Sequence, residues 1–402
     1  MGSRIQHKHI VLCVCGGIAA YKSVELLRLM VKQKANVRVL MTRHAAEFVQ
    51  PLTFEALSGQ PVCTSLFEHN SDASIRHIDW AQKADAVVVA PATANFIGKL
   101  ANGIADDAAG TFMLAVTSPV IICPSMNTHM YENRAVQKNL DILESYGHMI
   151  LEPTAGELAC GTTGPGRLPE PEHILDRIIC LLTPKDLKGK HVLVTAGPTR
   201  EPIDPVRFIS NPSSGRMGFA VAKAAEHRGA SVTLIAGPTT LANPVYVHTI
   251  RIQTAEDMAC AVFEHIKHAD IIIKTAAVSD YTPAAPAQQK IKKTEDTMTL
   301  SLKKTKDILK EIGKIKKDRI VVGFAAETEM LEKNATQKLF SKNLDIIAGN
   351  IIGAPSSGFE VQTNEVTLFY KNGTKEVLNI MAKEEIAHII LDRVLTLYPK
   401  KS

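Results

Sequence analysis

The sequence predicts two tandem α/β domains, each built on a doubly wound and mostly parallel sheet. The chain has 402 residues, enough for two or three domains of roughly 100–200 residues each. Short apolar runs alternate with amphipathic helical segments, which is the pattern of parallel strands joined by crossover helices. This pattern stops at a polar segment, 183–190, and then starts again.

The first domain is expected at 1–189. Its predicted buried strands are 9–15, 36–41, 84–90 and 119–123. Its predicted helices are 18–31, 127–146 and 173–182. Between the last two helices, residues 153–171 are rich in glycine and proline. They predict a long loop of the kind that often serves as a functional lid.

The second domain is expected at 190–402. Its predicted strands are 190–196, 230–236, 269–275, 319–323, 344–348 and 365–370. Its predicted helices are 214–227, 255–268 and 382–397. Both halves therefore have the alternation that is typical of Rossmann-like and flavodoxin-like domains.

Charge and cysteine content narrow the partners and the compartment. The net charge of +5 is spread along the chain, and the densest basic stretch, 290–306, also contains acidic residues. This favours anionic small ligands over nucleic acid. The seven cysteines form no CxxC pair and no zinc-type spacing, which fits a cytoplasmic protein. We expect neither a signal peptide nor a membrane partner, because no apolar run approaches the roughly 20 residues of a bilayer span.

Two segments of the first domain follow predicted strands and could hold an anionic ligand. Residues 15–22, CGGIAAYK, join the first strand to the first helix. Glycine lets the backbone approach a phosphate and the helix N-terminus supplies free N–H groups, although a tight turn explains this motif equally well. Residues 90–107 follow a later strand, at the edge where doubly wound sheets bind ligands. Asp107, within this segment, could instead be a simple helix N-cap.

Together with PSMNTHM at 124–130, these segments resemble the flavin-containing cysteine decarboxylases. RHID at 76–79 and GELACGTTGPGR at 156–167 are similar to the branch that acts on phosphopantothenoylcysteine. Trp80 and Tyr131 depart from the family pattern but leave its polar groups in place. The resemblance implies FMN at subunit contacts of a trimer-based assembly. It implies that FMN is bound by Gly16, Gly17, Ile18, Thr42, Pro91, Ala92, Thr93, Asn95 and Asp107.

The same resemblance assigns catalytic roles to His77, Asn127 and Cys160. FMN would oxidise the substrate's terminal thiol, and the resulting thioaldehyde would support loss of carbon dioxide. His77 suits proton handling near neutral pH, Asn127 would hold the substrate, and Cys160 on the lid would return a proton. Each residue also has a structural interpretation: a histidine packed beside Trp80, a helix N-cap and an inert thiol.

The second domain contains the longest motif of the chain, at 194–218, which runs from a strand through a polar turn into a helix. Ser213, Ser214 and Gly215 would present donors at the helix N-terminus, so we again expect an anion site. A plain Rossmann variant is the alternative, but the acidic residue expected for NAD is not evident. Lys338 and Lys342 share a face of a predicted helix, which could be solvated or could neutralise a triphosphate.

Residues 190–395 resemble the CTP-using bacterial phosphopantothenate–cysteine ligases, with AAVSDY at 276–281, KIKK at 290–293 and GFAAET at 323–328 as further motifs. The resemblance implies catalytic roles for Asn211 and Lys290, with Asn211 stabilising an acyl-cytidylate. It implies that the substrates are bound by Arg207, Ser213, Ser214, Gly215, Ala276, Asp280, Lys290, Lys306, Asp307, Ile308, Leu309, Phe324, Lys338 and Lys342. Mg²⁺ is implied without assigned ligands, and Gln289, Lys306 and Ile351 depart from the family pattern.

These resemblances predict a bifunctional enzyme of coenzyme A synthesis, in which the amide made by the second domain is the substrate of the first. Its partners would be small molecules, and it would form a homo-oligomer from decarboxylase trimers and ligase dimers. Two alternatives remain open. One is a peptidyl-cysteine decarboxylase with a silent second domain, and the other is a non-catalytic flavodoxin-like subunit.

Overall fold

The computed structural model describes residues 4–65, 73–158, 161–292, 297–351 and 363–398, with only the backbone at 73–77. The chain divides into two compact units, Met1–Thr183 and Pro184–Ser402. Each unit is an α/β fold with a mostly parallel sheet, so the predicted fold class is confirmed.

The first unit is built on a five-stranded, all-parallel sheet in the order β2-β1-β3-β4-β5. Its strands are β1 His9–Val14, β2 Asn36–Met41, β3 Ala86–Ala92, β4 Val120–Pro124 and β5 Met149–Ile150. Side chains of β1 alternate between two buried clusters, with Leu12 in one and Cys13 in the other. Both faces are covered, which explains why the strands are continuous apolar runs.

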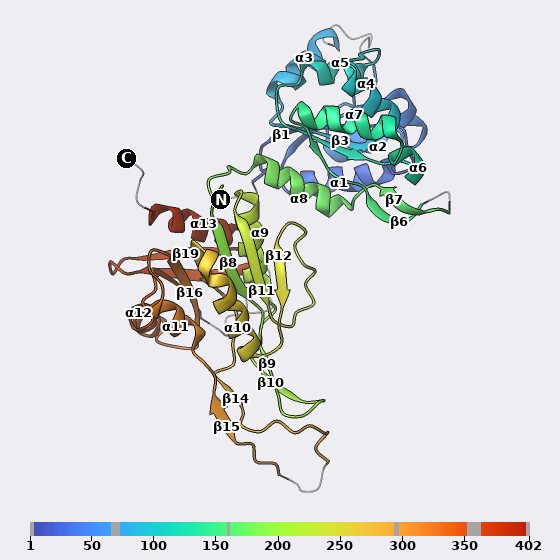
Figure 1. The fold of residues 1–402 in the computed structure, drawn as a ribbon. Helices are drawn as coiled ribbons and strands as arrows, with labels where there is room; N and C mark the ends of the chain where they lie inside the picture. Colours follow the sequence, from blue (N-terminus) through green and yellow to red (C-terminus); the bar gives the residue numbers. More distant parts are fainter. Residues whose placement is uncertain (1–3, 66–72, 159–160, 293–296, 352–362, 399–402) are drawn as a thin grey trace. The chain divides into compact units, whose positions relative to one another are not determined.

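Helices cover both faces of this sheet (Figure 1). One face packs against α1 Ala20–Lys32, α2 Pro51–Ser58 and α8 Pro171–Leu182. The other packs against α3 Ala73–Lys83, α4 Ala94–Ala101, α5 Ala108–Ala115 and α7 Arg134–Ser145. A short 3-10 helix, η1 Arg43–Glu47, follows β2.

Two local predictions for this unit were wrong. The single helix expected at 127–146 is two helices, α6 Thr128–Tyr131 and α7, because Asn133 caps α7 by accepting a hydrogen bond from the Ala135 amide. The long loop expected at 153–171 contains an antiparallel hairpin of β6 Thr154–Glu157 and β7 Thr163–Arg167. The segment is rich in glycine, which is unfavourable in strand interiors, so its composition did not indicate these two strands.

The second unit has an eight-stranded sheet in the order β12-β11-β8-β13-β16-β17-β18-β19. The pairs from β12 to β17 are parallel, whereas β18 and β19 run antiparallel. Its strands are β8 His191–Ala196, β11 Ser231–Ala236, β12 His248–Arg251, β13 Ile271–Lys274, β16 Ile320–Glu327, β17 Ile346–Ile351, β18 Thr363–Tyr370 and β19 Lys375–Ala382.

Helices again form a layer on each face of this sheet (Figure 1). One face packs against α9 Arg216–His227 and α13 Lys383–Thr396. The other packs against α10 Ala255–His265, α11 Ile308–Lys314 and α12 Leu331–Ser341, with η2 Ile266–His268 after α10. Two small hairpins lie beyond the sheet, β9 Arg200–Pro202 with β10 Phe208–Ser210 and β14 Tyr281–Pro283 with β15 Leu302–Lys304.

The burial of Phe112 should contribute strongly to the free energy of unfolding of the first unit. Phe112 on α5 is fully buried in the cluster that contains Trp80, the only tryptophan of the chain. We expect Phe112→Ala to lower the free energy of unfolding by about 3–5 kcal/mol, because it leaves a cavity. Leu114 on the same helix is 60% exposed, and Leu114→Ala should change it by less than about 0.5 kcal/mol. Urea unfolding followed by Trp80 fluorescence checks both; equal effects would contradict this packing.

Candidate functional site

In the first unit, the strand order reverses between β1 and β3. Strand β2 lies on one side of β1, whereas β4 lies on the far side of β3. Connections from two adjacent strands then leave toward opposite faces, which opens a crevice at their carboxyl ends; this is the ligand position in open α/β sheets. Gly16 and Gly17 follow β1, and Thr93 and Asn95 follow β3, so both predicted flavin segments meet at this crevice.

The turn after β1 requires glycine at one position. A Cβ on Gly16 would lie 2.4 Å from His44 Cβ and 2.6 Å from the His44 carbonyl carbon. The Thr42 amide donates to the Val14 carbonyl at 3.0 Å, which brings Thr42 to the same turn. A Cβ on Gly17 would make only ordinary contact, at 3.9 Å from Thr93 Cγ2.

The segment after β3 forms the other wall. Pro91 and Ala92 are buried at the end of the strand. Thr93 caps α4 by accepting from the Phe96 amide at 3.3 Å, and Asn95 is exposed in the first turn of the same helix. Asp107 caps α5, accepts from the Gly110 amide at 2.7 Å, and forms an ion pair with Lys99 at 3.1 Å. The N-cap interpretation of Asp107 is therefore confirmed. Ile18, in the turn after β1, is 65% exposed.

The turn that carries Asn127 is held against the β6–β7 hairpin. Asn127 Oδ1 accepts from the His129 amide at 2.9 Å, and the Met126 amide donates to the Gly166 carbonyl at 3.0 Å. A Cβ on Gly166 would lie 2.2 Å from the Met126 carbonyl oxygen, so the close approach needs glycine. The Ser125 amide donates to the Ala92 carbonyl at 3.0 Å, which connects this turn to the end of β3.

Two predicted catalytic residues of this unit have no described side chain. His77 belongs to α3, but only its backbone is described. Cys160 lies outside the described residues, between the strands of the hairpin. Of the other thiols, Cys13 and Cys123 are buried. The hydrogen bond with Cys15 together with burial raises the pKa of Cys13, and burial raises that of Cys123, well above the ordinary value. Both are core residues, as expected for Cys13.

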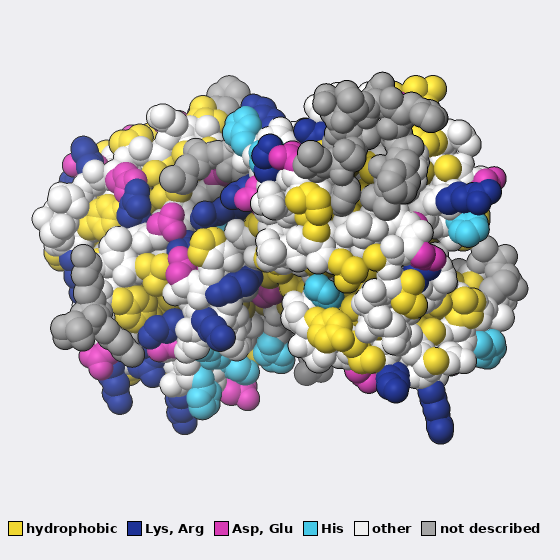
Figure 2. Space-filling model, turned by 90° about the horizontal axis from the view of Figure 1, so that it is seen from above, with side chains coloured by type: hydrophobic (Ala, Val, Ile, Leu, Met, Phe, Trp, Pro, Cys, Tyr) yellow, Lys and Arg dark blue, Asp and Glu magenta, His cyan; other side chains and the backbone are white. Residues whose placement is uncertain are grey.

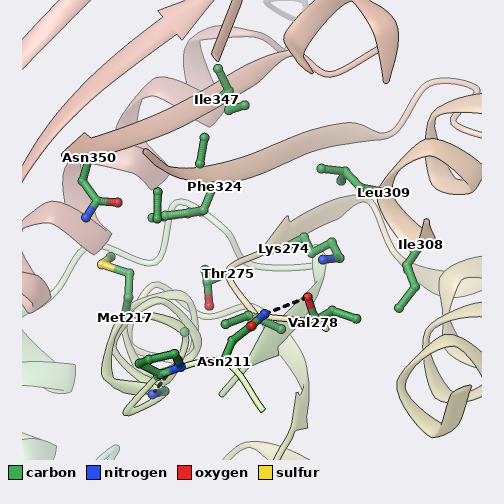
Figure 3. A pocket seen from close by; sticks show the side chains of 18 of the residues that line it. Asn211, Met217, Lys274, Thr275, Val278, Ile308, Leu309, Phe324, Ile347 and Asn350 are labelled. Atoms are coloured by element: carbon green, nitrogen blue, oxygen red, sulfur yellow. Dashed lines mark hydrogen bonds between the residues drawn. The ribbon is translucent and has the colours of Figure 1, made fainter. Parts of the chain in front are cut away.

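The second unit contains a pocket of about 460 Å³ at the carboxyl ends of β8, β13 and β16 (Figure 3). Strand order reverses here too, between β8 and β13. The pocket brings together residues that the sequence marked from five separate segments: Asn211, Ser213, Ser214, Gly215, Ala276, Asp280, Lys306, Asp307, Ile308, Leu309, Phe324, Lys338 and Lys342.

One wall of the pocket is the turn that leads into α9. Gly215 is the N-cap, with a φ of 76° that favours glycine, and its amide donates to Ser213 Oγ at 3.3 Å. A Cβ on Gly218 would lie 2.4 Å from Ala196 Cβ and 2.5 Å from Thr275 Oγ1. The first turn of α9 can therefore lie directly on β8, and its free N–H groups border the pocket.

Asn211 lies opposite the end of β13. Its Nδ2 donates to the Val278 carbonyl at 3.1 Å (Figure 3). The Ala276 amide donates to Thr195 Oγ1 at 3.3 Å, which fixes the loop after β13 against β8. The side-chain amide of Asn211 is thereby held against the loop after β13, in the lining of the pocket to which Ala276 also belongs.

Paired charges form the far wall. Lys338 contacts Glu327 at 2.7 Å and Lys342 contacts Asp307 at 2.9 Å. Burial disfavours the ionised form of Asp307, but hydrogen bonds from Lys342 and from the Lys310 amide hold the pKa of Asp307 below its usual value. Lys306 lies over the Phe263 ring, 4.5 Å from its centroid.

Two predicted residues do not line this pocket. Arg207 lies in the β9–β10 hairpin and forms an ion pair with Asp204 at 3.5 Å. Lys290 is exposed in the segment between β14 and β15. The next residue, Ile291, donates its amide to the same Asp204 at 3.2 Å, so Arg207 and Lys290 belong to neighbouring segments away from the pocket.

Sequence reasoning missed several residues that line the pocket, notably Lys274, Met217, Asn350, Asn364 and Lys383. Lys274 ends an otherwise apolar strand, which was a usable signal. Asn364 and Lys383 are buried polar residues from the end of the chain, and only folding brings them to β8, so no local pattern could have identified them.

The surface does not carry one dominant charge on the face shown in Figure 2, where basic and acidic side chains are interspersed with apolar ones. Within the described residues, no three His, Cys, Asp or Glu side chains are grouped as metal ligands would be. None of the helices in that part of the chain has the length and apolar character of a membrane span.

Comparisons with known proteins cover nearly the whole chain. The family described as Flavoprotein matches residues 2–183, and DFP, the DNA/pantothenate metabolism flavoprotein C-terminal domain, matches 187–398. The coenzyme A biosynthesis bifunctional protein CoaBC of Bacillus subtilis strain 168 is 49% identical over 397 residues, 98% of each chain. Its Escherichia coli K12 counterpart is 44% identical over 400 residues, also 98% of each chain. A crystal structure of a CoaBC C-terminal domain is 41% identical, covering 53% of this chain and 97% of that one, with a TM-score of 0.46.

The two neighbouring glycines after β1 offer a matched test of the crevice geometry. Gly16→Ala should lower the free energy of unfolding of the first unit by about 1–3 kcal/mol, because the added methyl meets the His44 backbone. Gly17→Ala should change it by less than about 1 kcal/mol. Urea unfolding read by Trp80 fluorescence measures both. A Gly16→Ala protein as stable as wild type would mean that the turn and η1 do not touch.

Proposed function

The chain belongs to the family of bifunctional coenzyme A biosynthesis proteins CoaBC, and from this premise we propose how its own residues carry the two reactions. The flavoprotein domain is the phosphopantothenoylcysteine decarboxylase, and the C-terminal domain is the phosphopantothenate–cysteine ligase. The proposal adds the co-substrate, the cofactor, the metal ion and the residue roles.

In the ligase, we propose that CTP activates the carboxylate of 4′-phosphopantothenate. The carboxylate attacks the α-phosphorus, the bond to the β-phosphate breaks, and an acyl-cytidylate and pyrophosphate form. The amine of cysteine then attacks the acyl carbon, loses a proton and expels CMP. Mg²⁺ would offset the charge of the pyrophosphate. The observation that carries this proposal is the pocket. The N-terminus of α9, Lys338, Lys342 and Asn211 all line it.

Each wall of the pocket supports a separate role. The Ser213–Gly215 turn offers backbone donors to phosphate. Lys338 and Lys342 supply positive charge opposite it. The Asn211 amide, next to Ala276, is positioned to donate to an acyl or phosphoryl oxygen as charge develops there. Arg207 and Lys290 would have to reach substrate from the neighbouring hairpin segments or from a second copy of the chain.

In the decarboxylase, we propose that the β1–β3 crevice holds FMN. The residues fit such a group: Gly16 lets the turn after β1 lie directly against His44 without a side chain of its own, and Gly17, Pro91, Ala92, Thr93 and Asn95 border the same strand ends. FMN bound there would supply the redox chemistry that lets the carboxylate leave and afterwards restores the thiol.

The chain's own residues would supply the binding and proton transfers. Asn127 would hold the substrate through its amide, next to the end of β3. His77 would handle a proton near neutral pH, and Cys160, which lies outside the described residues, would return one. The hairpin rests on the Asn127 turn and could exclude water there.

A homo-oligomer is also proposed, built from decarboxylase trimers and ligase dimers. The first unit exposes large apolar residues in the turn before α1, on α1 and on α2, with Ile18 at 65%, Tyr21 at 54% and Leu52 at 72%. In the second unit, Val206, Phe208, Tyr281 and Leu302 on the two hairpins are exposed. Exposed apolar groups of this size favour burial against another chain. We place the enzyme in the cytoplasm, where its thiols stay reduced.

One assay tests the whole proposal. Purified protein with bound flavin is supplied with 4′-phosphopantothenate, cysteine, CTP and Mg²⁺. We expect 4′-phosphopantetheine, pyrophosphate and carbon dioxide in equal amounts. A His77→Asn variant should release pyrophosphate but no carbon dioxide. Decarboxylation of peptides ending in cysteine without CTP consumption would instead favour a peptidyl-cysteine decarboxylase with a silent second domain.

Asn211→Asp should lower the ligase turnover by about 10²-fold or more, because it removes a donor and adds a negative charge beside the phosphates. Asn350→Asp changes another amide of the same pocket, at the end of β17, and is the matched control with a smaller effect. Pyrophosphate release and amide formation are measured separately in each variant. Normal amide formation by Asn211→Asp would remove the assigned role.

A further inference from the structure

Lys274 is a pocket residue that neither the motifs nor the proposed mechanism uses. It is the last residue of β13, where it pairs with Thr195 of β8 on one side and Gly323 of β16 on the other. Its side chain lies in the pocket wall between Val278 and Leu309 (Figure 3). A lysine at this position ends the apolar sequence Ile271–Ile273, three fully buried residues in the centre of the sheet.

The charges around Lys274 are incompletely balanced. Lys342 faces it, as do Asp307 and Asp280. Asp307 is already held by Lys342 at 2.9 Å and by the Lys310 amide at 3.0 Å. Within the described part of the chain, no carboxylate lies within ion-pairing distance of the Lys274 ammonium, whereas Lys338 and Lys342 each have one.

Lys274 is half-buried in the pocket wall, and even partial burial of an ammonium without a close counter-charge is unfavourable. Burial and the charge of Lys342 lower the pKa of Lys274 to about 8, against the attraction of Asp307 and Asp280. A lysine kept only for packing would be expected to extend its charge into water or to pair with an acid. Lys274 instead lies in the same pocket as the donors of the Ser213–Gly215 turn, which face ligands that carry several negative charges.

We propose that Lys274 binds a phosphate group of a ligase substrate, and that its protonation makes the affinity for that substrate depend on pH. The proposal rests on the ligase function proposed above. The phosphate belongs either to CTP or to 4′-phosphopantothenate, the two phosphorylated substrates of the pocket, and binding measurements with each ligand separate them. Lys274 adds a positive charge without a close carboxylate partner to the charges of Lys338 and Lys342, which are paired with Glu327 and Asp307.

The direction of the pH effect follows from the charge. A bound phosphate favours the ammonium, so the pKa of Lys274 rises on binding. Below pH 8 the ammonium is present before binding, and affinity is independent of this group. Above pH 8 a proton must be taken up on binding, so affinity falls as pH rises. The pKa of Asp307 is held below its usual value by Lys342 and the Lys310 amide, so Asp307 stays ionised throughout this range and does not contribute to the slope.

The test uses the full-length protein and isothermal titration calorimetry. Mg²⁺–CTP and 4′-phosphopantothenate are titrated separately at pH 7, 8 and 9, in buffers of different ionisation enthalpy, which counts the protons taken up. For one of the two ligands, wild type should take up a proton at pH 9 and bind more weakly than at pH 7. Lys274→Met should weaken that ligand by about tenfold or more at pH 7, without proton uptake.

Lys274→Arg is the second variant, because arginine keeps its charge across this range. It should restore affinity relative to Lys274→Met and show no proton uptake at pH 9. Lys310→Met removes an exposed lysine of α11 and should bind both ligands as wild type. Far-UV circular dichroism and a thermal unfolding transition unchanged from wild type show that each variant is folded.

Unchanged affinity for both ligands in Lys274→Met, or unchanged proton uptake in Lys274→Arg, overturns the proposal while leaving the ligase assignment in place. Failure of the wild-type protein to bind either ligand overturns the ligase assignment as well. Weakened binding of CTP alone assigns the contact to the nucleotide, and weakened binding of 4′-phosphopantothenate alone assigns it to the acid.

Discussion

Both units depend on one constraint, the reversal of strand order in a parallel sheet. Where adjacent strands send their connections to opposite faces, the backbone at their carboxyl ends is left uncovered, and a ligand can lie against it without displacing a helix. In the first unit this occurs between β1 and β3, and in the second between β8 and β13. The other features of each site are close backbone contacts that bring distant segments of the chain to this edge of the sheet.

Glycine residues permit three of these close contacts. Gly16 lets the turn after β1 touch η1, and Gly166 lets the hairpin touch the Asn127 turn. Gly218 lets α9 lie directly on β8. In each place a methyl group would push apart two segments that are distant in sequence. The same close contacts that hold the fold together therefore set the shape of both sites.

Electrostatics differ between the two units in a way that fits their chemistry. In the first unit, the thiols of Cys13 and Cys123 are buried and resist ionisation, so they do not compete with a substrate thiol. In the second unit, two of the pocket's lysines, Lys338 and Lys342, are paired with Glu327 and Asp307 before any ligand arrives. Such pairing keeps the empty pocket stable, and it leaves the unpaired Lys274 ammonium available to a phosphate.

The sequence alone determined the alternation of strands and helices and the segments that meet at each site. It could do so because buried parallel strands read as apolar runs and anion-binding turns carry glycine and serine next to a helix. It did not reveal the β6–β7 hairpin or the break before α7, where glycines and one capping asparagine outweigh periodicity. Only the tertiary structure decided that Arg207 and Lys290 lie away from the pocket, and that Lys274, Asn364 and Lys383 line it. Those positions depend on contacts between strands and loops far apart in the chain, which no local pattern records.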